Sequence, residues 1–140
     1  MVRAPGEVTL MKAVYYRSAD GTEPVDDFIN ELPIKTQAAL DLQIERLNML
    51  RPNDPPLPYP HSSHVTGNLR ELRCHYGKTL YRILYAPSGS LFVLLHIFRK
   101  DTQKIPRSEI TVALNRWSDF QHRMNSAPRR PPRAAGHDAP

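Results

Sequence analysis

The order of apolar and polar positions changes character along the chain and predicts a first strand followed by a helical hairpin. Residues 8–17 are rich in β-branched and aromatic side chains, which is typical of a strand. Apolar residues then recur at helical spacing over residues 24–32 and 35–50. Pro33 separates the two segments, because proline disfavours helix at the residue before it.

The second half of the chain alternates with a period of two, which predicts three antiparallel strands over residues 69–76, 79–86 and 91–98. Gly77-Lys78 fits a two-residue hairpin turn, and we expect a three-residue loop over 88–90. A final helix over 106–124 carries an apolar stripe of Ile110, Ala113, Leu114, Trp117 and Phe120. The predicted order is βααβββα. The fold class is α+β, an antiparallel sheet with the helical hairpin and the C-terminal helix against one face.

Two segments show neither the helical spacing nor the strand-like alternation of apolar residues. Residues 51–60 contain five prolines, so we expect a stiff loop that continues to residue 68. Residues 126–140 are rich in proline and arginine and offer almost nothing to bury, which predicts a disordered tail. We therefore expect one domain over residues 1–125. Removing the tail should then change the melting temperature by less than about 4 °C.

Composition excludes several classes of protein. The single cysteine, Cys74, rules out a disulfide framework and a multi-thiolate metal site. No apolar run approaches the roughly 18 residues of a membrane span, and the first ten residues lack a signal-peptide pattern. We expect a cytoplasmic protein without a membrane partner.

The charge is unevenly distributed. The net charge is +5, and residues 69–125 alone hold ten Lys/Arg against four Asp/Glu. A clustered positive field attracts polyanions, of which phosphate is the commonest in a cell. The alternative is a basic, solvated surface with no partner.

Most known catalytic motifs are missing from the sequence. It has no glycine-rich phosphate loop, and His61 and His64 lie in a proline-rich segment that is more typical of plain surface than of a metal site. The basic half holds too few carboxylates for a two-metal nuclease. We expect neither metal nor cofactor, so cleavage of a phosphodiester would proceed without metal.

Two strand arginines form the first candidate site. With a turn at Gly77-Lys78, Arg73 lies directly opposite Arg82, a like-charge pair that destabilises a sheet. Either each arginine pairs with a carboxylate such as Glu71, or an anion binds between them. We favour an anion site, because the planar guanidinium matches two phosphate oxygens.

His96 and the cations that follow it form the second candidate. A three-residue loop at 88–90 would place His96 opposite Arg82, so that residues 73, 82 and 96 form one row. His96 is then either a core residue or a proton carrier. Arg99, Lys100 and Lys104 follow this strand, where the edge of the sheet meets a loop and cations can bind a nucleic-acid backbone.

Several segments resemble a known family: LRELR, YRILY, LLHIFRKDTQKIPRSEI and a helix beginning VALNRW. They resemble the phage-derived Gp49-like branch of the HigB/RelE toxins, in the RelE/ParE superfamily, over about residues 11–121. The resemblance implies a RelE-like domain and a ribosome-dependent, metal-independent mRNA endonuclease. It also implies a toxin–antitoxin system, with a small helix-turn-helix antitoxin, the ribosome and mRNA as partners.

The resemblance also suggests roles for individual residues. It implies that the catalytic groups are Arg82, Arg73, His96 and Lys100. The basic side chains expected to bind RNA are Arg99, Lys104, Arg70, Lys78 and Arg107. Two alternatives remain open: a ParE-like DNA gyrase inhibitor of the same fold, and a basic nucleic-acid-binding module without catalysis. The two arginines favour the endonuclease, because a gyrase inhibitor needs no phosphate-cleaving site.

Overall fold

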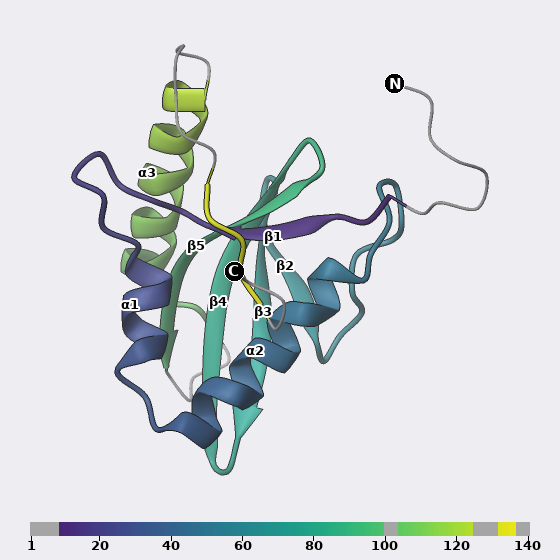
Figure 1. Ribbon diagram of the computed structural model, residues 1–140, viewed down its shortest axis with the longest axis vertical. Coiled ribbons are helices and arrows are strands. Elements are labelled where there is room, and N and C mark those ends of the chain that lie inside the picture. The colour runs from purple at the N-terminus through teal and green to yellow at the C-terminus, as the bar shows by residue number, and fades with distance from the viewer. Residues whose placement is uncertain (1–8, 100–103, 125–131, 137–140) are drawn as a thin grey trace.

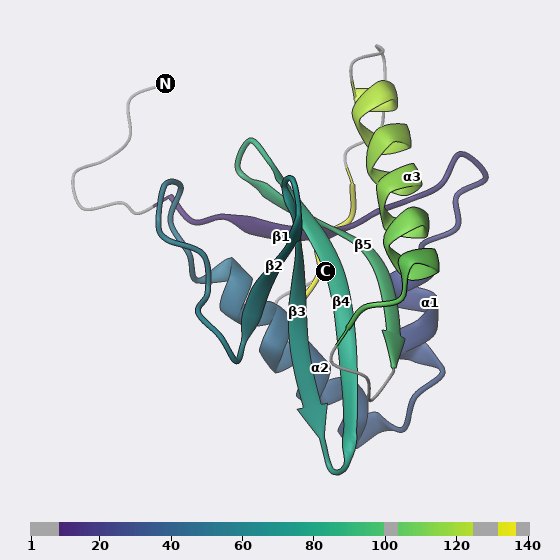
Figure 2. The same ribbon diagram turned by 180° about the vertical axis from the view of Figure 1, so that it is seen from behind.

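A computed structural model describes residues 9–99, 104–124 and 132–136 of the protein. Within these residues, one five-stranded sheet carries three helices (Figures 1 and 2). The elements in chain order are β1 (Lys12–Tyr15), α1 (Pro24–Asn30), α2 (Ile34–Asn48), β2 (Ser62–Thr66), β3 (Leu69–Tyr76), β4 (Thr79–Ser88), β5 (Leu91–Arg99) and α3 (Arg107–Met124). None of the described helices is both long enough and apolar enough to cross a membrane.

The predicted α+β class and helical hairpin are confirmed, but the helices cover both faces of the sheet. On one face, α1 and α2 bury Val25, Ile29, Leu40, Ile44 and Leu47 against the strands. Figure 1 shows these two helices in front of the sheet, and Figure 2 shows the face behind them. On the other face, α3 buries Ala113 and Phe120, while Leu114 of the predicted stripe is 41% exposed. The expectation of helices on one face is therefore wrong, because β4 and β5 are apolar on both sides.

The sheet is mixed, with the order β1-β5-β4-β3-β2. β1 runs parallel to β5, whereas the other neighbouring strands are antiparallel. The prediction of a wholly antiparallel sheet is corrected by this edge strand. The chain between β1 and β5 contains α1, α2 and the three other strands, so it is long enough for the crossover that a parallel pair requires.

Residues predicted to continue the proline-rich loop instead form a strand, β2, at the opposite edge of the sheet. It pairs with β3, and Ser62 lies opposite Leu72. Apart from the buried Ser62, its residues are half-buried or exposed, so the segment lacks the apolar alternation that marks a strand. The predicted order βααβββα is therefore one strand short. Polar side chains on an edge strand also discourage pairing with other chains.

The register between β3 and β4 is the predicted one. Tyr76 pairs with Thr79 across the Gly77-Lys78 turn, and Arg73 lies opposite Arg82. The two arginines therefore share one face of the sheet, the face that α3 partly covers.

The predicted position of His96 is wrong by two residues. Arg82 lies opposite Phe98, not opposite His96. Ser88 pairs with Leu91, so the turn after β4 has two residues instead of the predicted three. A bulge near Leu95 then shifts the register between β4 and β5 by one further residue. His96 still faces the same side as Arg82, because it lies two residues before Phe98 on the strand.

The last described segment corrects the prediction of a disordered tail. Residues 132–136 lie along β1, and Ala134 and Ala135 are 8% and 2% exposed. Disorder was expected because small residues bury little area; here backbone hydrogen bonds to β1 hold the segment. The other residues of the predicted tail lie outside the described ranges.

Cutting the chain after Met124 is therefore expected to destabilise the protein. The cut removes two backbone hydrogen bonds to β1 and one from Asn48, each with a net contribution of about 1 kcal/mol before the entropy of ordering is subtracted. We expect a loss of about 1–2 kcal/mol, which lowers the melting temperature by about 4–8 °C. Differential scanning calorimetry of the two chains measures this, and an unchanged melting temperature would show that the segment contributes nothing.

Candidate functional site

Arg73 and Arg82 converge on one carboxylate on the α3 face of the sheet. Glu71, two residues before Arg73 on β3, accepts a hydrogen bond at Oε1 from Arg73 Nη1 at 3.2 Å. Its Oε2 lies 3.5 Å from Arg82 Nε. The alternation of β3 places Glu71 and Arg73 on one face, and the cross-strand register brings Arg82 beside them. The internal carboxylate thus compensates for the like-charge pair that the sequence predicts.

The cluster is buried yet incompletely hydrogen-bonded. Arg82 is 1% exposed, and the side chains of Glu71 and Arg73 are 6% and 14% exposed. Four buried atoms have no hydrogen-bond partner among the described residues: Glu71 Oε2, Arg73 Nε, Arg82 Nε and Arg82 Nη1. Buried donors without protein partners are costly, and in native proteins such groups bind an ordered water or an ion, or serve in catalysis. Three of these atoms are N–H donors, which suit an anion.

Neighbouring groups hold the cluster in place. Ser63 of β2 donates to Glu71 Oε1 at 2.8 Å. The Arg73 guanidinium carbon lies 5.3 Å from the ring centroid of Tyr59, an exposed residue of the proline-rich loop. Gln43 of α2 donates to the backbone carbonyl of Arg73 at 2.8 Å. Three separate segments therefore fix the position of Arg73 and its carboxylate.

His96 belongs to a second polar group that joins β5 to α3. His96 Nε2 lies 3.0 Å from Glu109 Oε1, and His96 Nδ1 lies 3.2 Å from Arg116 Nη1. Because a guanidinium only donates, Nδ1 is the acceptor and the ring proton is on Nε2, directed at Glu109. Arg116 also donates to the Leu95 carbonyl at 2.9 Å, and burial lowers the pKa of its guanidinium.

The residues predicted to bind RNA do not lie together with Arg73 and Arg82. Arg70 and Arg99 alternate with the site-facing residues of β3 and β5, so they face the α1–α2 side. Arg70 is engaged there, since Nε donates to Ser62 Oγ and Nη2 to the Leu57 carbonyl. Lys78 is exposed in the β3–β4 turn, and Lys104 and Arg107 are exposed just before and at the start of α3. Lys100 lies outside the described residues.

Four residues of these groups were not predicted as site residues, although Glu71 was considered as an alternative partner of the arginines. They are Glu71, Tyr59, Glu109 and Arg116. The buried carboxylate had a signal, since Glu71 shares the face of Arg73 in a strand. The others carried none, because their contacts depend on the path of the loop and on the placement of α3.

Metal ligands do not gather in the described part of the chain. Among residues 9–99, 104–124 and 132–136, no group of three or more His, Cys, Asp or Glu side chains is placed to hold an ion. Burial raises the pKa of the Cys74 thiol to about 12, which keeps the thiol protonated.

Most of the chain matches one known protein family. Residues 27–118 match the family described as phage-derived protein Gp49-like (DUF891). The chain belongs to this family. The matched residues include Glu71, Arg73 and Arg82 as well as the His96 group, and they exclude β1 and residues 132–136.

Curated relatives agree with this assignment. The chain is 28% identical over 111 residues to a protein named "Probable endoribonuclease HigB1" from Mycobacterium tuberculosis strain CDC 1551 / Oshkosh. The alignment covers 79% of this chain and 85% of that protein. The protein of the same name from strain ATCC 25618 / H37Rv gives the same identity and coverage. The Gp49-like resemblance seen in the sequence is therefore confirmed.

Proposed function

We propose that this Gp49-like protein is the toxin of a type II toxin–antitoxin system, a metal-independent endoribonuclease that cuts mRNA on the ribosome in the cytoplasm. The observation that carries the proposal is the pair Arg73 and Arg82, whose buried N–H donors converge on one carboxylate. The name of the M. tuberculosis relatives supports RNA as the substrate. A small helix-turn-helix antitoxin is the proposed partner.

The proposed chemistry is an internal transfer at one phosphodiester. The ribose 2′-oxygen loses its proton and attacks the adjacent phosphorus, and the bond to the 5′-oxygen breaks as that oxygen gains a proton. The products are a 2′,3′-cyclic phosphate and a 5′-hydroxyl end. Negative charge grows on the non-bridging oxygens during attack, where Arg73 and Arg82 would stabilise it.

The free protein already holds an anion in this place. Glu71 accepts from Arg73 and lies beside Arg82, so an RNA phosphate would have to replace the carboxylate to reach both guanidiniums. Arg82, at 1% exposed, also requires local movement before it can touch a ligand. We propose that the ribosome supplies the ordered mRNA that drives this exchange.

His96 is proposed as a proton carrier beside the arginines. It faces the same side of the sheet, and Glu109 orients its Nε2–H. It lies diagonally from Arg82, at a typical Cα separation of about 7–8 Å for such pairs. Its contribution should therefore be smaller than that of Arg82.

The proposal is tested with purified protein in a reconstituted translation system. Primer extension should map cuts in translated mRNA, while the same mRNA without ribosomes stays largely intact over the same period, with or without a metal chelator. The reason is that Arg82 is buried beside Glu71 and His96 lies only diagonally from it, so an ordered mRNA is needed to bring the phosphate to these groups. Fast, chelator-sensitive cleavage of free RNA would contradict the proposal, as would inhibition of DNA gyrase with the mRNA left whole.

A further inference from the structure

The segment formed by residues 132–136 lies against the outer edge of β1 and forms a single antiparallel β-bridge with it. Tyr15 N donates to the Arg133 carbonyl at 2.9 Å, and Ala135 N donates to the Ala13 carbonyl at 2.8 Å. Val14 of β1 and Ala134 of the segment are the two residues of this bridge. Figure 1 shows the segment, in yellow, crossing β1. Its backbone thus fills hydrogen-bonding positions that the edge of β1 would otherwise leave open.

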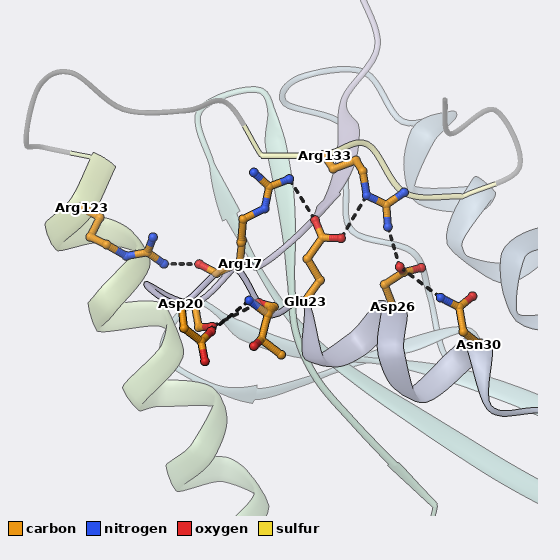
Figure 3. Close-up of polar contacts among 9 residues, drawn as sticks. Arg17, Asp20, Glu23, Asp26, Asn30, Arg123 and Arg133 are labelled. Atoms are coloured by element: carbon orange, nitrogen blue, oxygen red, sulfur yellow. Dashed lines mark hydrogen bonds and ion pairs between the residues drawn. The ribbon is translucent and has the colours of Figure 1, made fainter.

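One arginine anchors the segment to α1 (Figure 3). Arg133 Nε lies 3.0 Å from Glu23 Oε1, and Nη2 lies 2.6 Å from Asp26 Oδ2. The guanidinium carbon lies 4.8 Å from the ring centroid of Tyr15. Two carboxylates and an aromatic face therefore surround one cation, which is a recognition site for arginine.

The residues after the arginine are closely packed, since Ala134 and Ala135 are buried. Asn48 at the end of α2 accepts from Ala13 N at 2.7 Å and donates to the Ala135 carbonyl at 3.1 Å, so it joins β1 to the segment. Gly136 has a φ of +101°, and a Cβ there would lie 2.6 Å from Asn48 Nδ2. The site therefore holds a peptide with the pattern arginine, alanine, alanine, glycine, and the glycine is the position at which a side chain fits least.

We propose that this edge of β1 is a strand-addition site for an extended segment of a second protein, and that residues 132–136 occupy it in the free protein. The carboxylates of Asp26 and of Glu23, which also pairs with Arg17, favour an arginine in the incoming strand. Main-chain hydrogen bonds supply affinity and one side-chain anchor supplies specificity, as in other cases of strand addition. The resident segment can leave without breaking the pairing of β1 with β5.

Residues 132–136, the resident segment, determine how tightly a partner must bind in order to displace them. Only residues 125–131 separate it from α3, and a short tether gives an effective concentration on the order of millimolar. A peptide with the same sequence must therefore compete poorly with the wild-type chain. A partner that binds must either contact additional surface or act after the arginine anchor is lost.

The test uses the full chain and a fluorescent peptide with the sequence of residues 132–136, Pro-Arg-Ala-Ala-Gly, blocked at both ends. Anisotropy should show little binding to the wild type, because its own segment fills the site. Arg133→Ala weakens the resident segment, and the peptide should bind this chain at least tenfold more tightly than the wild type. A peptide with alanine in place of its arginine should lose this gain.

Matched variants separate the proposal from a general loosening of the fold. Adding Glu23→Gln and Asp26→Asn to Arg133→Ala should abolish peptide binding, whereas adding Asp54→Asn, in a distant loop, should not. Circular dichroism and melting curves establish that each variant folds. If Arg133→Ala unfolds, Gly136→Val opens the same site while keeping the arginine.

Three results would overturn the proposal. The first is a folded Arg133→Ala or Gly136→Val chain that binds no peptide. The second is peptide binding that persists after Glu23 and Asp26 are neutralised. The third is a wild-type dimer in which the segment of one copy fills the site of another, because the occupant would then be a second copy of this chain.

Discussion

Replacing Arg82 with alanine is expected to lower the rate of ribosome-dependent mRNA cleavage about a hundredfold. The side chain would contact the phosphate when its charge grows, and loss of such a contact costs on the order of 3 kcal/mol of transition-state stabilisation. Arg82 is the deeper of the two arginines, and its Nε and Nη1 have no hydrogen-bond partner among the described residues. Single-turnover cleavage on ribosomes loaded with one mRNA measures the rate directly.

Two control variants make the Arg82 result specific. Arg51→Ala removes the same charge from an exposed loop position and should leave the rate unchanged. Arg82→Lys keeps the charge but loses the planar fork, so it should recover only part of the rate. The Arg82→Ala protein should also stay folded and keep its affinity for the antitoxin. A rate within threefold of the wild type would remove Arg82 from the chemistry.

Glu71→Ala is expected to give the largest loss of stability. The substitution leaves two buried arginines opposite each other without their shared carboxylate. Removing one partner of a buried ion pair costs about 3–5 kcal/mol, because the remaining charge stays desolvated. Urea denaturation with an unchanged m-value should report this loss as a lower midpoint.

The matched control for Glu71→Ala is Glu31→Ala, which removes a carboxylate from the exposed end of α1. Surface substitutions of this kind change stability by about 0.5 kcal/mol or less. Glu71→Gln keeps the shape and some hydrogen bonds, so it should fall between the two. Equal losses for Glu71→Ala and Glu31→Ala would mean that the carboxylate does not hold the arginines.

The strongly patterned elements were predictable, and the weakly patterned ones were not. The stripe of Leu40, Ile44 and Leu47 fixed α2, and the Gly77-Lys78 turn fixed the pairing of Arg73 with Arg82. In contrast, β2 is a polar strand at the edge of the sheet, and its sequence does not show the alternation of apolar and polar residues that predicts a strand.

The candidate site shows the same division. The arginine pair followed from turn geometry, because register is determined locally within a hairpin. The position of His96 depended on a bulge near Leu95, inside a run that is apolar on both sides and so carries no register signal. The order of Ala134 and Ala135 depends on backbone hydrogen bonds to β1, and the bonded residues Tyr15 and Arg133 are 118 positions apart in the sequence. Small side chains give no sequence signal for such a long-range contact.

The parallel edge has a consequence during protein synthesis. Lys12 of β1 pairs with Leu91 of β5, which is 79 residues later in the chain. At typical elongation rates of 5–20 residues per second, β1 waits about 4–16 s for that partner, and about 6–24 s for the Arg133 segment that lies 118 residues after Tyr15. The nascent chain therefore carries β1 as an unpaired strand for seconds, and its outer edge is the last to close.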